Sequence, residues 1–171
     1  TPLTTTTDFI EYMLLPGQIY ISREPSLIST VLGSCVSVCL WSSRDKICGM
    51  SHYLYPITKI KEEATAKYGN VSLRCLLHLI LEQEKKKALQ AQIFGGAATD
   101  NPLCANIARE NVAVARRFLA KHGIKIISED TGGNMGRKIV YNSLTNEAII
   151  YKVHNLRRGD WYPYVQEEDS I

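Results

Sequence analysis

Residues 35–55 read CVSVCLWSSRDKICGMSHYLY, which is two apolar runs separated by the four polar residues 43–46. In the first run the side chains alternate, so that Val36, Val38 and Leu40 fall on one face of a strand and Cys35 falls on the other. The polar residues between the runs are typical of a turn. The stretch therefore predicts a β-hairpin of residues 35–42 and 47–55, with Cys35 at the start of one strand and His52 on the neighbouring strand.

The rest of the chain predicts an α+β domain around this hairpin. Helical periodicity indicates helices over about 71–90 and 107–122, and the second stops at Gly123, the residue type that commonly follows a helix. Alternating runs indicate strands over 18–22, 124–128, 137–142 and 147–153. Strands come first, helices in the middle and strands last, which favours α+β over a doubly wound sheet.

Length and composition indicate one domain. The chain has 171 residues, of which 45% are hydrophobic, enough for one sizeable core. We expect an N-terminal extension over 1–14, the domain over 15–155 and a C-terminal tail over 156–171, because both ends lack periodicity.

Charge and hydropathy exclude several classes of partner. Charged residues make up 22% of the chain and the net charge is +3, too small and dispersed to indicate nucleic acid or a membrane surface. The sequence contains neither an apolar run of about 18 residues nor a signal-peptide pattern, which predicts a cytoplasmic protein without membrane insertion. Its five cysteines form no CxxC pair, which disfavours a disulfide framework and a structural zinc site.

The candidate chemistry centres on Cys35. Gly33 and Ser34 allow a tight turn just before this thiol, where main-chain N–H groups could hold an oxyanion. His52, one strand away, could take the thiol proton, and a hydroxyl at Ser29 or Thr30 could orient its far ring nitrogen. Viewed singly, a cysteine or histidine in an apolar strand is more often structural.

The sequence gives weaker support to a metal site or a nucleotide site. Cys35, Cys39 and His52 could be three metal ligands, but a fourth ligand and paired spacing are missing, so no metal is expected. One glycine cluster, at 94–97, ends an apolar strand, and another, at 131–137, lies between two strands. Both are most simply turns, bulges or close backbone crossings. Neither fits a dinucleotide fingerprint or a P-loop, so no nucleotide or other cofactor is expected.

Six short motifs follow one another within residues 18–153: LGSCV (32–36), GMSH (49–52), KY (67–68), FGGA (94–97), NV (111–112) and GGNMGR (132–137). In these motifs and in their order the chain resembles the CheD family of bacterial chemotaxis proteins. The resemblance implies a protein-glutamine glutaminase that deamidates methyl-accepting chemotaxis receptors, and in some members hydrolyses their glutamyl methyl esters. It also implies layered mixed β-sheets with flanking helices, like the cytotoxic-necrotizing-factor-like cysteine deamidases.

By position, the resemblance implies that Cys35 is the nucleophile and His52 the base. The family's third residue is a threonine six positions before the cysteine, which falls on Ser29, and Ser29 is therefore preferred over Thr30. The resemblance further implies a possible CheC-like phosphatase partner. One alternative is a non-catalytic adapter that binds receptors or that phosphatase. Another is a peptidase or transglutaminase, although the surroundings of Cys35 and His52 do not resemble papain-type patterns.

Overall fold

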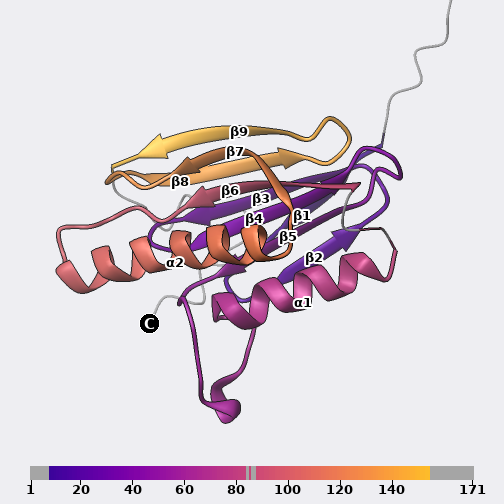
Figure 1. Ribbon diagram of the computed structural model, residues 1–171. Coiled ribbons are helices and arrows are strands. Elements are labelled where there is room, and N and C mark those ends of the chain that lie inside the picture. Colours follow the sequence, from indigo (N-terminus) through magenta and orange to yellow (C-terminus); the bar gives the residue numbers. More distant parts are fainter. Residues whose placement is uncertain (1–7, 84, 86–87, 155–171) are drawn as a thin grey trace, which may run out of the picture.

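The structure, a computed structural model, describes residues 8–83, 85 and 88–154, which form three layers (Figure 1). A four-stranded sheet has the order β1-β3-β8-β9, and a five-stranded sheet has the order β2-β5-β4-β6-β7. Helices α1 and α2 cover one face of the five-stranded sheet, and the four-stranded sheet packs on its other face. Each sheet combines parallel and antiparallel pairs. The α+β class with layered mixed sheets and flanking helices is confirmed.

The elements follow one another along the chain as β1 (Ile10–Met13), β2 (Ile19–Ser22), β3 (Ser26–Leu32), β4 (Val36–Ser42), β5 (Cys48–Tyr53), a 3-10 turn (Lys61–Glu63), α1 (Gly69–Leu81), β6 (Leu89–Gly95), α2 (Pro102–Lys121), β7 (Lys125–Thr131), β8 (Gly136–Asn142) and β9 (Glu147–Val153).

The predicted hairpin is present as β4 and β5, which pair antiparallel from Val36 opposite Tyr53 to Trp41 opposite Cys48. Its alternation divides the core in two. Val36, Val38 and Leu40 pack beneath the helices. Cys39 and Trp41 lie in the layer between the two sheets. Cys35 lies just before β4, so the expectation that it opens this strand is correct to within one residue.

The ends of both helices differ from the predicted ones. Helix α1 ends at Leu81 rather than about residue 90, and Leu89–Gly95 instead forms β6, a strand paired with β4 and β7. Residues 84, 86 and 87 of the predicted helix lie outside the described part. Helix α2 begins at Pro102, five residues earlier than predicted, because the Asn101 side chain accepts a hydrogen bond from the Leu103 N–H and caps it.

Two strands were not predicted. β3 (Ser26–Leu32) lies in the four-stranded sheet between β1 and β8. β1 (Ile10–Met13) falls in the segment 1–14 that the sequence sets apart as an extension, yet it pairs parallel with β3, and Leu14 after it is fully buried. The predicted tail, 156–171, lies outside the described residues.

Two connections between the sheets lie side by side. Residues 33–35 carry the chain from β3 to β4, and residues 132–135 carry it from β7 to β8. The Gly132 N–H donates to the Gly95 carbonyl at 3.0 Å, and the Ala98 N–H donates to the Gly133 carbonyl at 2.8 Å. These contacts bring both glycine clusters to the corner of the molecule that contains Cys35.

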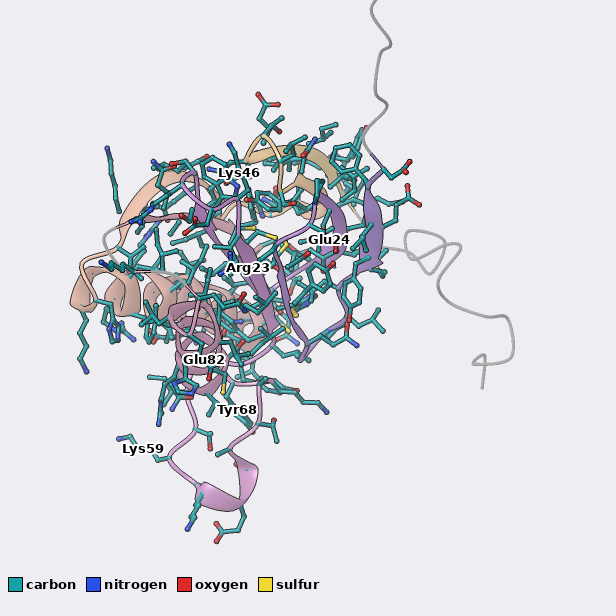
Figure 2. All side chains as sticks on the ribbon, turned by 90° about the vertical axis from the view of Figure 1, so that its right-hand side faces the viewer. Arg23, Glu24, Lys46, Lys59, Tyr68 and Glu82 are labelled. Carbon is teal, nitrogen blue, oxygen red and sulfur yellow. The ribbon has the colours of Figure 1, made fainter. Side chains whose placement is uncertain are left out.

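The segment between β5 and α1 projects away from the layers. Figure 1 shows its 3-10 turn far below the sheets, and Figure 2 shows the Lys59 side chain on the same projection. Ile57 and Ile60 are 46% and 53% exposed there. No helix in the described part of the chain has the length and apolar character needed to cross a membrane.

Candidate active site

The main chain around Cys35 is fixed by three hydrogen bonds to successive carbonyls. The Gly33 carbonyl accepts from the Ala97 N–H, and the Cys35 carbonyl accepts from the Gly96 N–H, both at 2.9 Å. Between them, the Ser34 carbonyl accepts from Nδ2 of Asn111 at 2.9 Å. The turn is therefore held to the end of β6 and to helix α2, and its Cys35 side chain is only partly exposed.

Gly95 allows this close approach. Its φ is +106°, and a Cβ added there would lie 2.3 Å from the Cys35 carbonyl oxygen. A side chain cannot occupy that space, because atoms that are not bonded do not approach so closely. The plain interpretation of the 94–97 cluster as a close backbone crossing is confirmed, and the structure identifies the Cys35 turn as the segment that crosses it.

His52 lies on the same face of the five-stranded sheet as Cys35. It is directly opposite Ser37 in the β4–β5 pairing, and side chains two residues apart on a strand share a face. Cys35 and His52 are thus diagonal neighbours, roughly 7–8 Å apart at Cα. The imidazole is fully buried. The prediction that the two residues lie on neighbouring strands is confirmed.

A short chain of hydrogen bonds sets the tautomer of His52. Thr30 Oγ1 donates its single proton to the Leu14 carbonyl at 2.7 Å. The same oxygen lies 2.8 Å from Nδ1 of His52, where it can then only accept, so Nδ1 carries the proton. Nε2 is left with a free lone pair, and it is buried without a hydrogen-bond partner among the described residues. This is the tautomer that a general base needs.

The preference for Ser29 is corrected: Thr30, not Ser29, contacts His52. Successive side chains of a strand point to opposite faces. Thr30 shares the inward face of β3 with Ile28 and Leu32, which lie in the core between the sheets, so Ser29 points to the other face. At the main chain, the Ser29 carbonyl accepts from the Leu14 N–H at 2.8 Å.

Burial keeps both groups neutral at pH 7. It raises the pKa of the Cys35 thiol to about 11, although a hydrogen bond from its own N–H opposes the rise. It lowers the pKa of His52 to about 4, against a hydrogen bond with the Leu14 carbonyl. The resting pair is therefore thiol and imidazole, not thiolate and imidazolium. Proton transfer must accompany attack on a substrate.

Alkylation of Cys35 is expected to follow this raised pKa. With a pKa of about 11 instead of 9.0, the thiolate fraction at pH 8 is about 100-fold lower than that of an ordinary thiol. Carbamidomethylation of Cys35, followed by peptide mass spectrometry, should still rise about tenfold per pH unit between pH 8 and 9.5 in native protein. In urea-unfolded protein the rise should level off near pH 9. A native profile that levels off below pH 9 would contradict the raised pKa of Cys35, and one that levels off below pH 7 would contradict the neutral resting pair.

Asn111 belongs to the site, although the sequence indicated it only as part of a motif. Its side chain is fully buried, and its Nδ2 bonds the carbonyls of Ser34 and Leu54 at 2.9 Å each. The signal was an amide within a stripe that is otherwise apolar. The buried residues of α2 recur at helical spacing, and Asn111 lies among Ala108, Val112 and Ala115.

The other cysteines lie apart from this arrangement or within the core. Cys39 and Cys48 are buried between the sheets, Cys75 is exposed on α1, and Cys104 is partly exposed on α2. All five cysteines are free. Among the residues that the structure describes, no three His, Cys, Asp or Glu side chains gather closely enough to hold a metal ion.

Comparison with known proteins relates the chain to the same family as its motifs do. The family described as "CheD chemotactic sensory transduction" matches residues 56–152. A relative in Trichlorobacter lovleyi is 37% identical over 144 residues, covering 82% of this chain and 89% of its own. One in Sulfurimonas denitrificans is 36% identical over 138 residues, covering 78% and 88%. One in Sinorhizobium medicae is 37% identical over 143 residues, covering 81% and 78%. Each is named a probable chemoreceptor glutamine deamidase CheD.

Proposed function

The chain belongs to the CheD family, and on that premise we propose that it is a protein-glutamine glutaminase that deamidates methyl-accepting chemotaxis receptors. The observation that carries the proposal is the hydrogen bond between Thr30 and Nδ1 of His52. It leaves Nε2 unprotonated on the strand next to Cys35, so the site has a thiol and a base in the required form. The relatives' names supply the substrate class, chemoreceptor glutamine.

In the acylation step, Nε2 of His52 takes the proton of the Cys35 thiol while sulfur attacks the side-chain carbonyl carbon of the substrate glutamine. The carbonyl oxygen becomes an oxyanion, for which the Cys35 N–H, already directed at the sulfur, is a suitable donor. The C–N bond then breaks, ammonia leaves with the proton from His52, and a thioester remains on Cys35.

In the second step water releases the product. His52 takes a proton from a water molecule while the water oxygen attacks the thioester carbon. The C–S bond then breaks, and the Cys35 sulfur recovers the proton from His52. Glutamate is released, and the receptor gains one negative charge per turnover. Added charge on a helical bundle changes its packing energy, so deamidation can bias a signalling equilibrium.

Thr30, rather than Ser29, is the proposed third member. Thr30→Val keeps the shape but removes the acceptor for Nδ1–H, so we expect kcat for receptor deamidation to fall about 100-fold, the scale seen when a base loses its orientation. Thr30→Ser restores the hydroxyl and should recover most of the rate. Ser29→Ala should stay within about twofold of wild type, because Ser29 faces away. Equal reductions of kcat in Thr30→Val and Ser29→Ala would contradict the assignment of Thr30 as the third member.

The function is tested by incubating the purified protein with cytoplasmic fragments of chemotaxis receptors. Ammonia release should equal the number of glutamines that gain about one dalton by peptide mass spectrometry, as an amide becomes an acid. Peptide cleavage or amine incorporation would instead indicate a peptidase or transglutaminase. Receptor binding without any mass change would instead indicate a non-catalytic adapter.

Three finer expectations accompany this proposal. A CheC-like phosphatase would be a second partner, tested by co-purification. The receptor fragments concerned lie in the cytoplasm, so the protein would act there. The layered sheets with a cysteine where the chain crosses between them would also correspond to the cytotoxic-necrotizing-factor-like deamidases, which superposition of the Cys35, His52 and Thr30 main chains would test.

A further inference from the structure

We infer that Asn111 is a positioning residue that fixes Cys35 relative to His52. The inference rests on the proposed roles of these two residues. Asn111 lies in the middle of α2, on the helix layer, whereas the reacting side chains face the other side of the sheet. It therefore acts through the main chain.

The Asn111 amide joins two strands where their pairing stops. The β4–β5 ladder ends at Val36 opposite Tyr53, although Cys35 and Leu54 would continue it. Instead the chain after β5 turns away, and the Leu54 N–H donates to the Lys67 carbonyl at 2.8 Å. The Ser34 and Leu54 carbonyls are left side by side, and Nδ2 of Asn111 donates one hydrogen to each at 2.9 Å.

Only an amide or another double donor fits this position. Two carbonyl oxygens repel each other, and the NH2 group has two hydrogens to satisfy both, whereas a carboxylate or an aliphatic group has none. Ser34 directly precedes the nucleophile, and Leu54 follows His52 by two residues. The amide therefore sets the separation of the two segments that carry the reacting groups.

A further hydrogen bond holds Asn111 itself in place. The buried Tyr53 hydroxyl donates to the Asn111 main-chain carbonyl. Tyr53 is adjacent to His52 and its side chain lies on the helix side of the sheet. The helix position that carries the amide is thus tied to the strand that carries the base, and the Cys35 turn is tied to that helix.

The test compares Asn111→Ala and Asn111→Asp with Val114→Ala, a control that removes buried apolar volume elsewhere on α2. For both Asn111 variants we expect kcat for receptor deamidation to fall about 10- to 100-fold with KM within about threefold, because a misplaced nucleophile slows chemistry more than binding. Val114→Ala should keep kcat within about twofold. All are measured at 25 °C, after thermal unfolding has established that each variant is folded at that temperature.

A second measurement, the alkylation rate of Cys35, needs no receptor. We expect this rate to rise in the Asn111 variants, whereas kcat falls. Without the amide the Cys35 turn should become better solvated, so its carbamidomethylation at pH 8 should become about tenfold faster than in wild type, as the thiol pKa returns toward its ordinary value. A thiol that is more reactive toward a small reagent yet less active on substrate is the signature of lost positioning. Val114→Ala should leave the alkylation profile unchanged.

The outcomes separate the two proposals. If wild type deamidates no receptor, the proposed function fails, while the alkylation comparison still tests whether Asn111 fixes the Cys35 turn. Asn111 variants with a wild-type alkylation profile and kcat would overturn the inference, as would equal changes in Val114→Ala. Failure of both Asn111 variants to fold, with Val114→Ala folded, would also overturn it, because Asn111 would then serve the fold rather than the separation of Cys35 and His52.

Discussion

Replacing Cys35 by alanine is expected to abolish receptor deamidation while the fold stays intact. The proposed mechanism has no other nucleophile, since the carbon–sulfur bond of the thioester forms on this atom, and loss of a nucleophile typically lowers kcat by at least about 10⁴-fold. The turn itself is held by main-chain carbonyls of residues 33–35, which alanine retains. The free energy of unfolding should therefore change by less than about 1 kcal/mol. Peptide mass spectrometry and denaturant unfolding measure the two effects.

Two other cysteines supply the matched controls. Cys75 is exposed on α1 and Cys104 is partly exposed on α2, so Cys75→Ala and Cys104→Ala remove an accessible thiol without touching the corner between the sheets. Both should deamidate at the wild-type rate. Activity above about one tenth of wild type in Cys35→Ala, or its loss in Cys75→Ala, would show that the thioester forms elsewhere or does not form.

The hairpin was predictable because its information is local. Period-two alternation places every second residue on one face, and four polar residues between two apolar runs specify the connection. Pairing through such a turn brings Cys35 and His52 together without knowledge of the remaining chain. The 94–97 glycine cluster was predictable as a close crossing, but its partner was not, because the contact between Gly95 and the Cys35 turn joins segments 60 residues apart.

The orienting hydroxyl was not predictable in the same way. Counting back from Cys35 gives Ser29 or Thr30, and these two side chains point to opposite faces of β3. β3 reads SLISTVL, with hydroxyl side chains on both faces, so its own alternation does not mark the buried side. Packing of the two sheets decides which face is buried: Ile28 and Leu32 enter the core between the sheets, and Thr30 on the same face reaches His52 of the other sheet.

The end of α1 shows the same dependence on tertiary structure. The polar residues after Leu81 suit a helix end as well as a turn, and the apolar residues of β6 suit either a helix face or a buried strand. Pairing of β6 with β4 on one side and β7 on the other selects the strand. The same strand then supplies Gly95, with Gly96 directly after it, so the site depends on an element whose first two residues, 89 and 90, periodicity assigned to the preceding helix.

Gly95→Ala is expected to be among the most destabilising single substitutions near the site. A φ of +106° is a conformation that alanine adopts at a cost of about 1–3 kcal/mol. In addition, the new Cβ would lie 2.3 Å from the Cys35 carbonyl oxygen, so the main chain must move and the hydrogen bond from the Gly96 N–H must stretch. We expect a total loss of about 3–5 kcal/mol in the free energy of unfolding, measured by urea denaturation.

Gly123→Ala separates the two contributions to this loss of stability, the cost of the positive φ and the cost of the Cβ contact. Gly123 also has a positive φ, +66°, but a Cβ added there meets no atom within 4 Å. It should therefore show only the cost of the left-handed conformation, about 1 kcal/mol. The excess loss in Gly95→Ala measures the contact with the Cys35 turn. Because relief of that contact moves the carbonyl of the nucleophile, the folded fraction of Gly95→Ala should also deamidate at least tenfold more slowly, whereas Gly123→Ala keeps the full rate. Equal unfolding free energies for the two variants would mean that the turn has room to yield, and that Gly95 is needed only for its φ.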